Sequence, residues 1–78
     1  MLTSDQIRAA RALVRWSAED LARESGVGLS TIRRIEGAEG VPSASARNIA
    51  LIQNALERAG VQFIAANGGG PGVRLSAR

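Results

Sequence analysis

The residues best suited to chemistry in this chain are arginines, because the sequence contains no cysteine and no histidine. Arg33 and Arg34 are adjacent near the middle of the chain, and Ser30 precedes them by about one helical turn. A guanidinium group can donate paired hydrogen bonds to a guanine edge or to a phosphate. Two surface arginines can also be plain solvated charges, so the elements that position them must decide between these interpretations.

Enzymatic chemistry has little support in the sequence. Without cysteine or histidine, the usual zinc ligands are missing and disulfides cannot form. The carboxylates are scattered, so their spacing assembles neither an acid–base pair nor an activated nucleophile. The glycine run at 68–70 is not followed by the Lys-Ser/Thr pair of a phosphate-binding loop. We therefore expect no enzyme activity, no catalytic residue, no bound metal and no cofactor.

Two short predicted helices meet at Gly26. Ser17 and Asp20 have the spacing of a capping box, in which a hydroxyl accepts a backbone N–H of the first turn, so the first of these helices begins there. Gly26 can adopt the left-handed conformation that ends a helix. Val27 is then expected to fill the angle between the two helices.

The second of these helices carries the arginine pair. Ile32 and Ile35 are three positions apart and predict an apolar stripe on a helix that ends at Gly37. A helix that buries these isoleucines must turn Arg33 and Arg34 outward, where the major groove of DNA, about 12 Å wide, can admit it. The preceding turn therefore favours DNA recognition over solvated charge.

A longer helix precedes the pair, and a fourth helix and two strands follow it. Thr3 and Gln6 form another capping-box pair, and Pro42 interrupts helical structure after the arginine helix. The predicted ranges are 3 to about 16 for the first helix, 44–59 for the fourth, which Ser43 can cap and Gly60 ends, and 61–65 and 73–75 for the strands. The fold class is therefore mainly α, with a four-helix domain at 1–60 and a C-terminal extension at 61–78 that forms a short β-hairpin or strand pair.

Length and charge are consistent with one small nucleic-acid-binding domain. The 78 residues allow a single compact core. Ten arginines against seven acidic residues give a net charge of +3, which favours nucleic acid only modestly. The sequence has no apolar stretch of about 20 residues and no signal-peptide pattern at its start. We therefore expect a cytoplasmic protein with no membrane association and no small-molecule ligand.

Residues 17–37 resemble the helix-turn-helix of the phage-repressor-like family, also called the Cro-type or xenobiotic-response-element family. The motifs that carry the resemblance are Leu21-Ala22, Gly26-Val27, Thr31-Ile32 and Ile35-Glu36. The four-helix frame extends the similarity to about Gly60. The resemblance implies a lambda-repressor-like fold, a bacterial or phage source, and double-stranded DNA as the partner.

The resemblance also implies roles for individual residues. In this family, residues at the start of the third helix and one turn later contact base edges, and here these are Leu29, Ser30, Arg33 and Arg34. Contacts to phosphate are expected from the start of the second helix and from nearby side chains, namely Ser17, Ala18, Thr31, Arg15 and Arg47. The family usually has glutamine at the position of Ala18 and serine at that of Gly28, so one DNA contact and one helix cap are weakened in this chain.

Other polar residues are expected to be structural. Family members place a basic residue at the position of Arg11 that pairs with the glutamate corresponding to Glu36, so we expect a semi-buried ion pair. Trp16 is expected to pack at the end of the first helix. The remaining arginines that lack positional support are expected to pair with nearby acids: Arg8, Arg23 and Arg58 with Asp5, Glu19, Glu24 or Glu57.

The sequence thus predicts a sequence-specific transcriptional regulator, a repressor rather than an activator, that reads the major groove with residues of about 29–36. One such helix covers too few base pairs for useful discrimination, so we expect a homodimer on a palindromic operator. The expected dimer contacts are Val61, Phe63, Ile64, Val73 and Leu75. The alternative is a protein-interaction module of the same fold, antitoxin-like or an adaptor, for which DNA binding is secondary.

Overall fold

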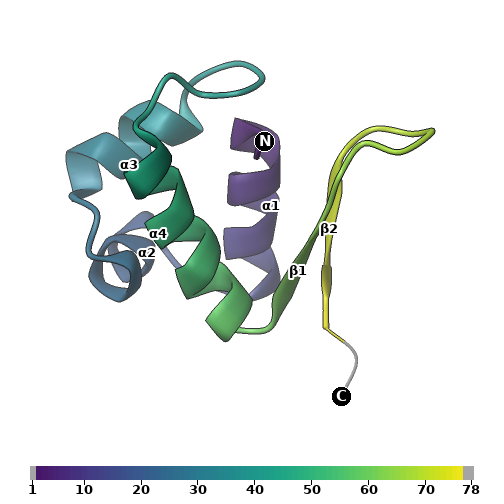
Figure 1. The fold of residues 1–78 in the computed structure, drawn as a ribbon. Coiled ribbons are helices and arrows are strands. Elements are labelled where there is room, and N and C mark those ends of the chain that lie inside the picture. Colours follow the sequence, from purple (N-terminus) through teal and green to yellow (C-terminus); the bar gives the residue numbers. More distant parts are fainter. Residues whose placement is uncertain (1, 77–78) are drawn as a thin grey trace.

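The computed structural model describes residues 2–76, which form four helices and one two-stranded antiparallel sheet. The elements are α1 (Ser4–Leu13), α2 (Ala18–Ser25), α3 (Leu29–Glu36), α4 (Ala46–Arg58), β1 (Val61–Ile64) and β2 (Gly72–Leu75). Figure 1 shows α1 between the β-hairpin on one side and the other three helices on the other. The predicted mainly α fold with a short C-terminal strand pair is confirmed.

Capping-box predictions are confirmed at two helix starts. The Gln6 N–H donates to Thr3 Oγ1 at 3.0 Å, and the Thr3 N–H donates to Gln6 Oε1 at 2.9 Å. Ser17 and Asp20 exchange the same pair of bonds at 3.0 and 2.9 Å. Each box satisfies backbone donors that would otherwise lack an intrahelical partner. These two local motifs therefore determine where α1 and α2 begin.

Helix α1 ends earlier than predicted, at Leu13 rather than near Trp16. The chain leaves the helix through Arg15, whose φ of 59° is left-handed. The Arg15 N–H donates to Ala12 O at 3.1 Å, and the Trp16 N–H donates to Arg11 O at 2.9 Å. These two bonds form a Schellman motif, which normally has glycine at the left-handed position. Without that glycine, the sequence carried no local signal for the end of α1.

Helix α4 begins at Ala46, so the predicted start at residue 44 with a cap from Ser43 is wrong. The cap is Ser45, whose hydroxyl accepts the Asn48 N–H at 3.1 Å. Ser45 has an extended backbone (φ −65°, ψ 147°) directly before the first helical residue, so its side chain, and not that of Ser43, serves as the cap. At the other end the helix stops at Arg58, and Gly60 follows with φ 108°.

The core is made of apolar side chains from all four helices, the flanking loops and β1. Its buried members are Leu2, Ile7, Ala10, Leu21, Val27, Ile32, Ile35, Ile52, Ala55, Leu56 and Val61. Val27 lies between α2 and α3 as predicted, and Trp16 is partly buried against this core. Full burial of a large aliphatic side chain stabilises a fold by about 1.5–3 kcal/mol, so these residues hold the helices in place.

The hairpin is attached to α1 through the buried side chain of Gln6. In the hairpin, β1 and β2 pair so that Ile64 lies opposite Gly72. The Gln6 amide nitrogen donates to Ile64 O at 3.1 Å and to Gly72 O at 3.0 Å, while its oxygen still caps α1. The Gln6 side chain therefore joins the first turn of α1 to both strands of the hairpin.

Candidate nucleic-acid interface

Helix α3 has one buried side and one exposed side. Ile32 and Ile35 are 0% and 1% exposed, and they anchor the helix in the core. Ser30, Arg33 and Arg34 are exposed on the opposite side. Two further predicted contact residues at its start, Leu29 and Thr31, are partly buried. The apolar stripe thus orients the polar side chains toward solvent, as the sequence pattern predicted.

The two arginines of α3 differ in their surroundings. Arg33 Nη2 lies 4.0 Å from Glu19 Oε1, and both side chains are more than 60% exposed. Exposed pairs at that distance contribute little, so this contact does not prevent Arg33 from binding another group. Within residues 2–76, no carboxylate forms a salt bridge with Arg34.

The N-terminus of α2 is a second polar feature. The Ala18 N–H belongs to the first turn of the helix, where backbone donors have no intrahelical acceptor and can bind an anion. The Ser17 hydroxyl accepts from Asp20 N–H, and its own proton remains available for a phosphate oxygen. The backbone hydrogen bond from Ser17, followed by the one from Arg23, lowers the pKa of Asp20. Asp20 therefore stays ionised and holds this cap in place.

Two predicted phosphate contacts lie outside α2 and α3. Arg15 is exposed in the turn between α1 and α2, and Arg47 is exposed in the first turn of α4. Neither forms a salt bridge with a carboxylate of the described chain. Both guanidinium groups are therefore exposed to solvent and open to a phosphate.

Arg11 and Glu36 are joined across α1 and α3. Arg11 Nε and Nη2 donate to the two carboxylate oxygens of Glu36 at 2.9 and 2.8 Å, and Nη1 donates to Trp16 O at 3.1 Å. The hydrogen bond to Glu36 raises the pKa of Arg11. Because Glu36 is only 8% exposed, this bidentate pair holds α3 against α1 instead of facing a ligand.

Other arginines also find partners within the protein. Arg8 pairs with Asp5, as the sequence suggested. Arg23 lies 3.7 Å from Glu24, one of its predicted partners, and pairs more closely with Asp20 at 2.8 Å, a partner that the i, i+3 spacing on α2 could have identified. Arg58 donates to the backbone oxygen of Glu24 at 3.3 Å. These guanidinium groups therefore serve local contacts on the helices.

Ser4 is a positioning residue that the sequence analysis missed. Its hydroxyl donates to Ile35 O at 2.7 Å, and its N–H donates to Gly40 O at 2.8 Å. The residue is fully buried, so it fixes the C-terminal end of α3 and the following loop against α1. A serine near a helix start has many local uses, and nothing in its sequence context indicates this long-range partner.

The predicted dimer contacts occupy different environments. Val61 is 2% exposed and belongs to the core of the chain itself, so its expected role as a dimer contact is corrected. Phe63 and Val73 are partly buried against the core. Ile64 and Leu75 are 36% and 53% exposed, so they present apolar surface to solvent.

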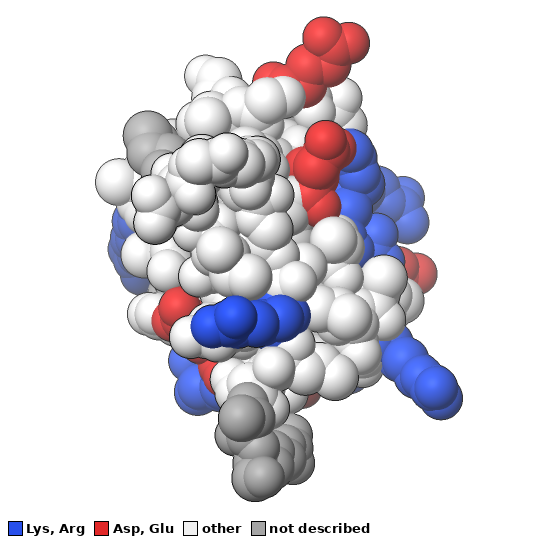
Figure 2. Space-filling model, turned by 90° about the vertical axis from the view of Figure 1, so that its right-hand side faces the viewer, with Lys and Arg blue, Asp and Glu red and all other residues white. Residues whose placement is uncertain are grey.

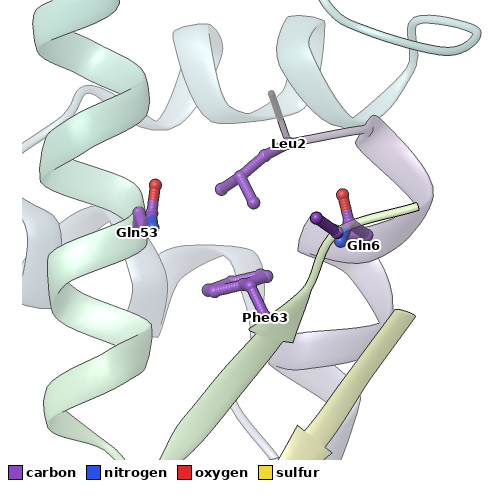
Figure 3. Close-up of a pocket in the computed structure, with 5 residues that line it drawn as sticks. Leu2, Gln6, Gln53 and Phe63 are labelled. Atoms are coloured by element: carbon purple, nitrogen blue, oxygen red, sulfur yellow. The ribbon is translucent and has the colours of Figure 1, made fainter. Parts of the chain in front are cut away.

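Two small hollows lie near the hairpin and α4. One of about 220 Å³ is lined by Leu2, Gln6, Gln53, Phe63 and Ala65. Figure 3 shows Gln53 on α4 and Phe63 on β1 facing each other across it. The other, of about 310 Å³, is lined by Leu2, Gln53 and residues at the start of α4 and just before it. Neither hollow is lined by a residue predicted to contact DNA.

The glycine turn between α2 and α3, with α3 buried on one side and basic on the other, defines a helix-turn-helix motif. The Gly26 φ of 78° makes the turn, and Val27 is buried beneath it. A family model described as helix-turn-helix matches residues 7–59. The chain belongs to this family, the phage-repressor-like, Cro/C1-type DNA-binding proteins. No curated protein matches the sequence.

The family assignment supports DNA binding and transcription regulation in general terms. Across residues 2–76, no helix is both long and apolar enough to cross a membrane. The same part of the chain holds no group of three or more acidic side chains placed to bind a metal ion.

Proposed function

We propose that this protein is a sequence-specific transcriptional repressor that binds double-stranded DNA as a homodimer, with α3 in the major groove. One observation carries the proposal: Ser30, Arg33 and Arg34 are exposed on the side of α3 opposite the buried Ile32 and Ile35. Arginine pairs geometrically with guanine O6 and N7, and serine can contact any base edge.

The size of α3 supports a dimer. Its eight residues extend only about 12 Å along the helix axis, so one α3 covers only a few base pairs. Two copies on half-sites about 34 Å apart multiply the discrimination. Binding of this kind represses transcription by occupying the promoter, which needs no second contact surface. The regulator would act in the cytoplasm of a bacterium, on chromosomal or phage DNA.

Selection from a random pool of DNA duplexes tests the proposal directly. The expected result is an enriched palindrome whose half-sites are separated by one helical turn. That result would establish the ligand class and the symmetry together. A pool in which no sequence is enriched contradicts the proposal and favours the protein-interaction alternative.

Substitution of the arginines on α3 tests their role. Arg33→Ala and Arg34→Ala should each weaken binding to the selected sequence by about 1–3 kcal/mol and reduce discrimination at one base pair. Binding to random duplex should change much less. Arg58→Ala on α4, outside the candidate interface, is the matched control and should leave both affinities unchanged. Equal losses on selected and random DNA would assign the arginines to phosphate and contradict base reading.

A further inference from the structure

One edge of the hairpin has unpaired backbone groups. The Ser76 N–H donates to Gly60 O at 2.7 Å, so this pair is hydrogen-bonded. Antiparallel ladders alternate between hydrogen-bonded and non-hydrogen-bonded pairs. By this alternation Arg74 also turns its N–H and C=O toward β1, whereas those of Val73 and Leu75 point away from it. The free edge of β2 therefore offers two N–H and two C=O groups.

The surface next to this edge is apolar. Leu75 is 53% exposed, and Leu13 at the end of α1 is 39% exposed. Gln6 faces the hairpin, and Ala9 and Leu13, three and seven positions later, lie on the same side of α1. Figure 2 shows uncharged surface over much of the hairpin side of the molecule, with one basic side chain across its middle and further charged side chains at its rims. A partner approaching the β2 edge would therefore meet small or aliphatic residues on α1.

We propose that two copies of this chain pair through their β2 edges, antiparallel, with Arg74 at the two-fold axis. This inference rests on the proposed function, which requires a dimer. In this register Val73 exchanges two hydrogen bonds with Leu75 of the partner subunit, and Leu75 does so with Val73 of the partner subunit. The two hairpins then form one four-stranded sheet, and both apolar cross-strand pairs lie on the face that packs on the helices.

Neighbouring registers satisfy fewer groups. If the pairing shifts by one residue, backbone groups that point toward β1 in one copy lie opposite groups that point away from β1 in the other. The shift also moves the apolar side chains off the face that packs on the helices. A shift of two residues toward the loop places Leu75 opposite Pro71 of the partner subunit, which has no N–H to donate. A shift of two residues toward the C-terminus pairs Leu75 with Leu75 of the partner subunit and leaves Val73 without a pairing residue within residues 2–76. The register centred on Arg74 is therefore favoured.

Arg74 makes the pairing sensitive to charge. Across the axis it faces Arg74 of the partner subunit, and like charges directly opposite on two strands are destabilising. Its Nε donates to Gln62 Oε1 at 2.6 Å, which draws the guanidinium toward β1 and away from the axis. A charged side chain on an edge strand opposes edge-to-edge pairing in general. The homodimer contact therefore forms against a repulsion that the Gln62 hydrogen bond reduces, and its strength depends on ionic strength.

Cysteine cross-linking tests this register, because the chain has no cysteine of its own. Across a non-hydrogen-bonded antiparallel pair the Cα atoms are about 4.5 Å apart, within the range of a disulfide. Arg74→Cys should therefore convert to a disulfide-linked dimer under mild oxidation. Leu75→Cys is the matched control: its diagonal Cα separation of about 7–8 Å is too long, so it should stay mostly unlinked. Faster linking at position 75 than at 74 would overturn the register.

Parallel measurements separate this inference from the proposed function. The reduced Arg74→Cys protein should remain dimeric in light scattering and should bind the selected DNA with unchanged affinity. A protein that is dimeric and binds its palindrome but links at neither position overturns the edge pairing and leaves the repressor proposal standing. A protein that links at position 74 but selects no DNA sequence supports the pairing and overturns the repressor. A monomer that links at neither position overturns the pairing.

Discussion

At the scale of single residues, Arg15 stands out because its backbone conformation disfavours its side chain. Among residues 2–76 it is the one non-glycine residue with positive φ. A left-handed conformation costs an L-residue about 1–2 kcal/mol, and glycine avoids most of that cost. Backbone strain of this kind is concentrated at functional sites. We infer that the predicted phosphate contact of its exposed guanidinium is the reason that an arginine, and not glycine, occupies this turn.

Arg15→Gly should therefore change stability and DNA binding in opposite directions. The free energy of unfolding should rise by about 1 kcal/mol, because glycine adopts the turn without strain. Affinity for DNA should fall by a similar factor on selected and random duplexes, since a phosphate contact carries no sequence information. Urea unfolding and fluorescence anisotropy measure the two effects. Arg15→Lys keeps charge and strain and serves as the control. Unchanged DNA affinity in the glycine variant would contradict a phosphate contact.

At the scale of elements, Gln6 couples the start of α1 to the end of the hairpin. An isolated two-stranded hairpin is marginally stable in water, so β1 and β2 need support from a helix. The support comes from apolar contacts of Val61 and Val73 with the core and from the two bonds that the Gln6 amide donates. A polar residue that is only 4% exposed can hold this position because each of its donors and its acceptor is satisfied.

Gln6→Glu should loosen the hairpin and leave α1 intact. Glutamate keeps the oxygen that accepts the Thr3 N–H, but it loses the donors and turns a carboxylate toward two carbonyl oxygens. We expect a loss of about 1–3 kcal/mol of stability, with faster amide exchange in β1 and β2 than in α1. Asn54→Asp on the exposed surface of α4 is the control and should alter neither. Protection factors that stay high in the hairpin would contradict the coupling.

At the scale of the whole molecule, salt should act in opposite directions on dimerisation and on DNA binding. DNA binding weakens because bound phosphates release counterions. The slope of log K against log salt is about −4 if Arg15 and Arg47 of both copies each neutralise one phosphate. Dimerisation should strengthen between 0.05 and about 0.5 M salt as the Debye length shrinks and the two Arg74 charges are screened.

Sedimentation without DNA and anisotropy with DNA separate these two salt responses. Arg74→Gln removes the repulsion and should give a dimer whose stability depends little on salt, while its DNA affinity keeps the steep slope. A native dimer that weakens with salt would contradict the placement of Arg74 at the axis.

Much of the candidate interface could be predicted from local sequence. The Ser17 cap, the Gly26 turn and the Ile32–Ile35 stripe each act within one or two turns of helix, and together they orient Arg33 and Arg34 outward. Such signals depend on short-range geometry that the residue types themselves impose. The same rules failed at the end of α1, where Arg15 occupies a position normally held by glycine.

The order of helices and strands and the outward face of α3 were determined by the sequence by itself, because caps, turns and apolar periodicity operate between close neighbours along the chain. Only the tertiary structure decided that Gln6 holds the hairpin, that Ser4 holds the end of α3, and that Val61 belongs to the core instead of a partner. The residues in these contacts are between 31 and 66 positions apart. Their partners are selected by packing and by the need to satisfy buried polar groups, and no local pattern encodes that choice.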